Sequence, residues 1–171
     1  QYQESVMSMA ANEPIVRLLM KAGQELGDSS TEMKRQLIGL PVSGPLNISP
    51  TEYRAGRDRR FGRSNPEVMK VPFWHEMVRA GVNAYEARRQ FGDTDRLSKP
   101  VWCFDRFGMS FTELPDGRFV QIGGEHEDHY DPDFCIYNEV VIHDRAGRFE
   151  IKGYPEEVFS PTDFHSATLL D

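Results

Sequence analysis

The chain has little cysteine and no long apolar run. Its two cysteines, Cys103 and Cys135, both lie in apolar stretches and do not form a Cys-x-x-Cys pair. We therefore expect reduced, buried thiols in an intracellular, cytoplasmic protein rather than a disulfide or a zinc site. No uncharged apolar run approaches the roughly 20 residues of a membrane span, so we expect no membrane segment. Neither a Gly-x-Ser-x-Gly elbow nor a phosphate-binding loop is present, and the sequence predicts no catalytic residue.

Basic residues are scarce in the second half of the chain. Residues 1–99 hold 15 Lys and Arg against 12 Asp and Glu, whereas residues 100–171 hold 5 against 15. Phosphate binding requires cationic side chains, so the acidic second half argues against nucleic acid as a ligand. The basic run at 54–60, "RAGRDRR", has no interleaved aromatic residue. We expect this run to be solvated or to pack against the acidic half.

The first half is expected to be a helical region over residues 1–99. Apolar residues at helical spacing predict helices over about 5–26 and a short helix ending before Pro41. One apolar stripe predicts a single long helix from Pro72 to Gly92. Between these helices, four prolines and three glycines predict a linker or extended strap over 41–66.

After Pro100 the apolar pattern changes from a helical to a strand-like period. Short runs rich in β-branched and aromatic residues alternate with turns, and Asp116-Gly117 gives the strongest hairpin signal. The pattern predicts about four antiparallel strands, followed by the opening strand of a further unit. The runs are "VWCF", "MSFTEL", "RFVQIGG", "FCIYNEVVIH", "RFEIKGY" and "HSATLL".

This second half resembles a kelch-type β-propeller repeat over residues 101–171. The stretch that begins at Phe107 recurs in spacing at Phe164, close to the period of a kelch blade. The residues that carry the resemblance are the paired glycines Gly123 and Gly124, Asn138 at the head of the third strand, and His165 with Ser166. The pattern also looks like a widespread group of microbial and fungal proteins with this propeller signature, which implies a fold but no particular activity.

The resemblance implies an α+β chain in which a helical region precedes one blade, at 100–171, and the first strand of the next. One blade cannot close a ring, and the first residue is Gln1 rather than Met. We therefore expect a fragment of a longer propeller protein; the alternative is that residues 1–99 cover the sheet and complete an α+β domain. The implied function is a protein-interaction or ligand-binding module.

An acidic loop rich in histidine joins two of the predicted strands. It could contact a protein partner, or hold a divalent cation through His126, His129 and Asp131 in a metal-dependent hydrolase or oxidase. The two histidines lie three residues apart, which does not match the metalloprotease helix motif, so we favour the loop as a blade connection without cofactor. If an ion binds, calcium fits better than zinc because carboxylates predominate. The binding-loop candidates are Glu125, His126, Glu127, Asp128, His129, Asp131 and Asp133.

Overall fold

The computed structural model describes residues 31–41, 44–94, 99–126 and 133–170. The chain divides into two compact units, Gln1–Leu37 and Ile38–Asp171. In the first unit, residues 31–37 are helical. In its described residues the second unit contains three helices and two sheets, so the expected mixed α+β class is confirmed. The boundary between units therefore lies at 37/38, whereas the change of sequence period suggested 99/100.

A five-stranded antiparallel sheet forms the centre of the second unit. Its strand order is β1-β7-β6-β3-β2, and the four strands β2, β3, β6 and β7 follow one another as the expected meander. A separate two-stranded ribbon pairs β4 with β5. The strands are β1 (Glu67–Val68), β2 (Ser110–Glu113), β3 (Phe119–Ile122), β4 (Glu125–His126), β5 (Cys135–Ile136), β6 (Val140–His143) and β7 (Phe149–Gly153).

The fifth strand of this sheet comes from the half of the chain that was expected to be helical. Glu67 pairs with Gly153 and Val68 with Lys152, so β1 covers the outer edge of β7. Just beyond β1, the backbone N–H of Met69 donates to the carbonyl of Ile151 at 2.8 Å. The part of the first half that begins at Ile38 therefore belongs to the same folded unit as the second half.

The expected extended strap contains a helix, α3 (Pro50–Gly56), so that part of the prediction was wrong. Ser49 caps the helix: its hydroxyl accepts from the Glu52 backbone N–H, and the Glu52 carboxylate accepts from the Ser49 backbone N–H. Pro50 stands at the first helical position, where its missing N–H costs no hydrogen bond. The proline that suggested an extended strap is therefore a helix start.

The single helix predicted from Pro72 to Gly92 is two helices, α4 (Pro72–Ala80) and α5 (Ala84–Gln90). Gly81 ends α4 in the left-handed region at a φ of 66°. Asn83 then caps α5, because its side chain accepts from the Glu86 backbone N–H at 2.8 Å. A left-handed glycine followed by an asparagine cap turns the chain although the apolar stripe continues.

Two of the predicted strands are absent from the described residues. "VWCF" makes one isolated bridge, between Val101 and Asp58. All four of its side chains are buried. Trp102 within it stacks on Trp74 with ring centroids 4.8 Å apart. "HSATLL" forms no strand over 165–170. An apolar run can therefore be buried as an irregular segment as well as in a sheet.

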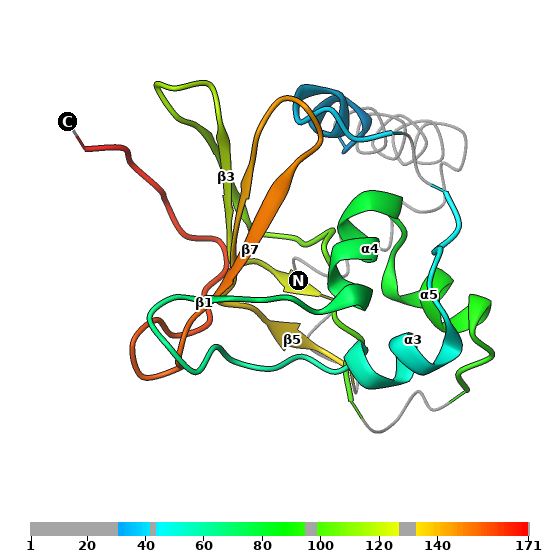
Figure 1. Cartoon of the computed structure of the whole chain (residues 1–171). Coiled ribbons are helices and arrows are strands. Elements are labelled where there is room, and N and C mark those ends of the chain that lie inside the picture. Colours follow the sequence, from blue (N-terminus) through cyan, green and yellow to red (C-terminus); the bar gives the residue numbers. More distant parts are fainter. Residues whose placement is uncertain (1–30, 42–43, 95–98, 127–132, 171) are drawn as a thin grey trace, which may run out of the picture. The chain divides into compact units, whose positions relative to one another are not determined.

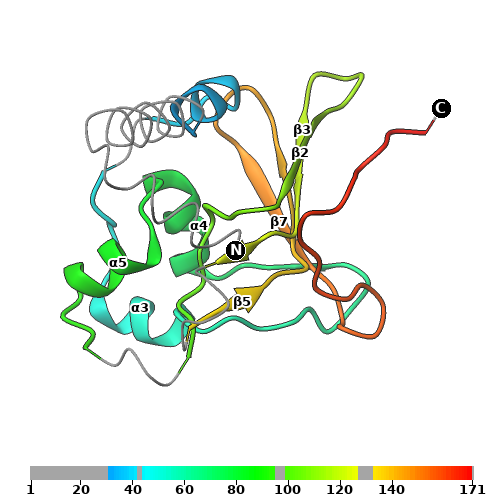
Figure 2. The same cartoon turned by 180° about the vertical axis from the view of Figure 1, so that it is seen from behind.

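The core lies between the helices and one face of the five-stranded sheet. Within the second unit, α3, α4 and α5 all lie on the same side of this sheet (Figure 1), and the reverse view agrees (Figure 2). Phe119, Val141 and Ile151 are buried on that face, in one cluster with Met69 and Trp74. Both cysteines are free and buried, as expected. None of the helices in the described ranges is long and apolar enough to cross a membrane.

Candidate functional site

The acidic loop is described only at its two ends. Glu125 and His126 form β4 and pair with Ile136 and Cys135 of β5. The predicted contact residues Glu127, Asp128, His129 and Asp131 lie outside the described residues. The loop therefore begins and ends in a short antiparallel ribbon, and its role as a contact surface stays a prediction.

His126 at the start of the loop is buried, with 6% of its surface exposed. The pKa of His126 is lowered to about 4: burial is the main cause, Asp133 opposes it, and Arg106 and Arg88 add to the lowering. The imidazole is therefore neutral near pH 7. A neutral, buried side chain is suited to packing in the ribbon rather than to an exposed polar contact.

Asp133 at the end of the loop is held by Arg88 of α5. The two side chains form an ion pair with a distance of 3.2 Å between Nη2 and Oδ2, and both are largely buried. The same nitrogen of Arg88 donates to the backbone carbonyl of Lys99 at 3.1 Å. This contact joins the end of the loop to α5. The ion pair of Asp133 is therefore a structural one.

The proposed cation site is not assembled within the described residues. In the ranges that the structure describes, no three His, Cys, Asp or Glu side chains are grouped so that they could hold a metal ion. Of the three suggested ligands, His129 and Asp131 lie outside these ranges. The metal hypothesis remains a prediction from sequence alone.

The paired glycines of the kelch-like pattern are required by a close backbone contact. Gly123 has a φ of 58°, and a Cβ atom added to it would lie 2.3 Å from the carbonyl oxygen of Thr162. Gly124 donates its backbone N–H to that same oxygen at 2.8 Å. Only glycine permits both this backbone conformation and this approach. The segment after β7 thus returns to the end of β3.

Asn138 fixes the same returning segment from the other side. Its Nδ2 donates to the backbone carbonyls of Tyr154 and Phe159, at 3.2 and 2.6 Å. The Asn138 side chain is buried. Its two hydrogen bonds attach the turn after β7 to the segment between β5 and β6. Asn138, which the repeat pattern singled out, therefore stabilises the fold.

His165 and Ser110 lie in contact although 55 residues separate them. His165 Nε2 is 3.1 Å from the Ser110 hydroxyl, whereas Ser166 is exposed. A hydroxyl beside an imidazole is the arrangement of a nucleophile and its base. However, the Nδ1 atom of His165 is buried and makes no hydrogen bond in the described part of the chain. The third group that would orient the ring is therefore missing there, and we assign no catalysis to this pair.

A buried ion pair that the sequence did not predict lies next to Gly123, whose carbonyl accepts a hydrogen bond from Arg106 at 3.2 Å. Arg106 and Glu139 are 3.1 Å apart, and their side chains are 1% and 0% exposed. The Arg106 guanidinium also lies 3.5 Å from the centre of the Tyr137 ring, and Trp102 Nε1 donates to Glu139 at 3.2 Å. Because the site is closed to solvent, the group can position the segments around it but cannot contact a ligand.

The sheet has a second face that no described helix covers. Val120 and Ile142 are paired across β3 and β6 on this face, as are Ile122 and Val140, and all four side chains are half-buried. Thr112 of the edge strand lies opposite Val120. We call these five residues the open face. On the same face, the charged Glu150 and Lys152 of β7 lie beside Ile142 and Val140. The open face is bordered by the His165–Ser110 contact.

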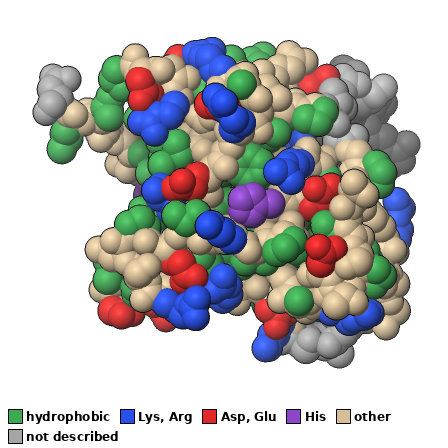
Figure 3. Space-filling model, in the orientation of Figure 1, with side chains coloured by type: hydrophobic (Ala, Val, Ile, Leu, Met, Phe, Trp, Pro, Cys, Tyr) green, Lys and Arg blue, Asp and Glu red, His purple; other side chains and the backbone are tan. Residues whose placement is uncertain are grey.

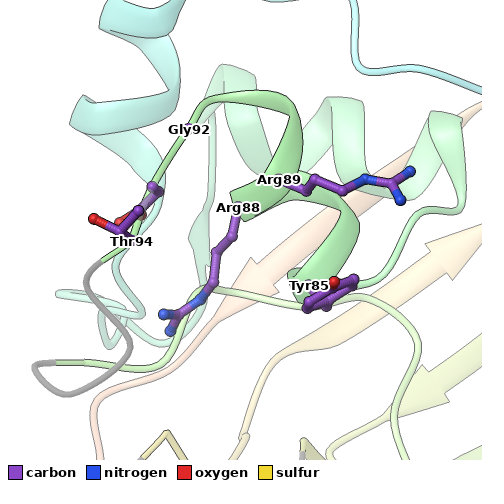
Figure 4. Close-up of a pocket in the computed structure, with 6 residues that line it drawn as sticks. Tyr85, Arg88, Arg89, Gly92 and Thr94 are labelled. Carbon is purple, nitrogen blue, oxygen red and sulfur yellow. The ribbon is translucent and has the colours of Figure 1, made fainter.

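Two adjoining recesses lie where α5 ends. They have volumes of about 280 and 290 Å³, and both are lined by Gly92, Asp93 and Thr94. Tyr85, Arg88 and Arg89 complete the first (Figure 4), while the second is completed by Tyr53, Arg54, Arg57 and Phe91. Sequence reasoning missed this site, although a double arginine before Gly92 was the available signal.

Charges elsewhere on the surface are mixed. On the face shown in Figure 3, basic and acidic side chains are interspersed. The arginines of the 54–60 run pair mainly with acids of the same half: Arg57 with Asp93, and Arg60 with Glu67. The run also contacts the second half through its backbone, since Asp58 bridges Val101 and the Trp102 N–H donates to the Arg57 carbonyl at 2.7 Å, while Arg54 and Arg60 are exposed.

Comparison of the chain with protein-family models, with curated proteins and with solved structures found no match. The argument about function consequently depends on the residues and contacts described above.

Proposed function

We propose that this chain is a cytoplasmic protein-interaction module, and that its β2-β3-β6-β7 meander serves as a kelch-like blade that docks against another β-sheet. The observation that carries the proposal is the open face. Four branched aliphatic side chains on adjacent central strands stay half-exposed there, while the opposite face is buried under helices. Blades of a propeller bury such faces against neighbouring sheets.

The position of the last described segment also supports a blade. The backbone N–H of Phe164 donates to the carbonyl of Gly108 at 2.8 Å, so the two stretches with matching spacing lie side by side. In a repeat protein, equivalent segments of successive units adjoin in this way. The free, buried cysteines agree with the reducing compartment that the proposal assumes.

The edges of the sheet make face-to-face docking more favourable than edge pairing. The β7 edge is already covered by β1, and the edge strand β2 is only four residues long. Short edge strands limit pairing with another chain. A partner with an aliphatic sheet face therefore fits this surface. In this proposal the acidic loop contributes further contacts to the partner.

Self-association is the direct test, because a second copy of the chain carries the same open face. Sedimentation of the full chain between about 10 and 500 µM should show a reversible dimer. Ile142→Lys should weaken the dimer at least tenfold, because a charge would be placed in the contact. Val158→Lys is the matched control, since Val158 is 50% exposed and lies outside the sheet. A monomer at every concentration, or equal weakening by both variants, would contradict the proposal.

A further inference from the structure

The side chains on the uncovered side of the sheet form two parallel rows. Paired residues of neighbouring antiparallel strands point to the same side of a sheet, so each of the four long strands gives one side chain to each row. The first row is Ser110, Ile122, Val140 and Lys152, and the second row is Thr112, Val120, Ile142 and Glu150. All eight are half-buried. Residues 166–170 leave the sheet on this side (Figures 1 and 2) and are exposed, so they do not bury the rows.

The two rows match each other strand by strand. The edge strand β2 gives a hydroxyl to each row. The central strands β3 and β6 each give one isoleucine and one valine, in opposite order. The last strand, β7, gives Lys152 to the first row and Glu150 to the second. A copy of the face turned so that its second row lies over the first therefore brings hydroxyl onto hydroxyl, aliphatic onto aliphatic side chain and base onto acid.

A two-fold axis produces this turn. The axis runs across the strands, midway between the two rows, and lays each strand over its own copy in the opposite direction. Closed homodimers are most often related by a two-fold axis, which requires a contact surface that is complementary to itself. Two stacked sheets with nearly aligned strands are the ordinary packing of a β-sandwich. The arrangement therefore needs no unusual sheet geometry.

The charges of β7 distinguish this arrangement from others. Lys152 and Glu150 form an ion pair within the chain, and their side chains are 26% and 46% exposed. A purely aliphatic sheet docked over them would remove water without supplying an opposite charge, which is unfavourable. A two-fold axis along the strands would place β7 over β2, so each charge would meet a hydroxyl. Of these arrangements, only the axis across the strands places Lys152 over Glu150 of the second copy.

We propose that the partner of the open face is a second copy of this chain, related by the two-fold axis across the strands, and that ion pairs between Lys152 and Glu150 of the two copies fix this orientation. The aliphatic side chains of both copies supply the buried contact, and the charges disfavour other orientations. This inference rests on the proposed function, because it names the partner and the orientation of the same face.

The test measures the dissociation constant of the full-chain dimer by sedimentation. Glu150→Lys and Lys152→Glu should each weaken the homodimer at least tenfold, because like charges then face each other across the two-fold axis. A mixture of these two variants should associate as tightly as the unmodified chain, within about threefold, because every facing pair again has opposite charges. Recovery in the mixture also shows that both variants fold.

Arg54→Glu is the matched control, since Arg54 is exposed on α3, which lies on the other side of the sheet. It reverses one charge, as Lys152→Glu does, and should leave the dimer unchanged. Single β7 variants that dimerise like the unmodified chain, or a mixture that does not associate, would overturn this inference. The proposed function would then still be supported if the unmodified dimer is weakened by Ile142→Lys. An unmodified chain that is monomeric at every concentration would overturn both.

Discussion

At the scale of single residues, the stability of the fold depends strongly on the buried pair Arg106 and Glu139. Both side chains are closed to solvent, so removing one charge leaves the other buried and uncompensated. We expect Arg106→Met to lower the free energy of unfolding by about 3–5 kcal/mol. Urea unfolding of the single variants and of Arg106→Met/Glu139→Gln measures this. The double variant should cost clearly less than the sum of the singles, and additive costs would mean that the two charges do not interact.

The two cysteines give a second prediction at the residue scale. Burial raises the pKa of the Cys103 thiol to about 12 and also raises the pKa of Cys135. At pH 8 only about one Cys103 thiol in ten thousand is ionised, and the thiolate is the reactive form. We expect no reaction of the native protein with a disulfide reagent, but two equivalents after unfolding in guanidinium.

A third, exposed thiol provides the control for this measurement. Ser166 is exposed, so Ser166→Cys should react at once in the native protein and give one equivalent. Rapid reaction of two thiols in the unmodified native chain would show that Cys103 and Cys135 are accessible, contrary to the structure.

At the scale of elements, local patterns predicted some structures and missed others for identifiable reasons. The meander was predictable because alternation and the Asp116-Gly117 turn act over a few residues. The break between α4 and α5 was missed because the apolar stripe runs through it, while the decisive signals were Gly81 and Asn83. Pairing of β1 with β7 joins residues more than 80 positions apart, and nothing in a two-residue strand predicts its partner.

The candidate sites were less predictable than the fold. The acidic loop was singled out by composition, yet His126 is buried and Asp133 is paired with Arg88. The recesses at Gly92 depend on contacts between α3 and α5, which residue types alone do not reveal. Sequence can indicate which residues are charged, but their pairing depends on tertiary packing.

Comparing Gly123 with Gly92 separates the cost of backbone strain from the cost of a steric clash. Gly123 and Gly92 both have a φ near 60°, but an added Cβ would meet the Thr162 carbonyl only at Gly123, and nothing within 4 Å at Gly92. Gly92→Ala should therefore cost about 1–2 kcal/mol of stability, from strain alone. Gly123→Ala should cost clearly more, because a backbone segment must also move. Equal costs in thermal or urea unfolding would contradict this close contact.

For the whole molecule, the position of the unit boundary decides which part of the chain folds independently. The sheet face that carries Phe119, Val141 and Ile151 is covered by residues from before position 100, including Met69 and Trp74. A chain of residues 38–171 should therefore unfold cooperatively, with dispersed NMR signals. A chain of residues 100–171 should not, because this face would be exposed and β1 would be absent from the sheet edge. Cooperative unfolding of the shorter chain would instead place the boundary at 99/100, where the change in sequence period falls.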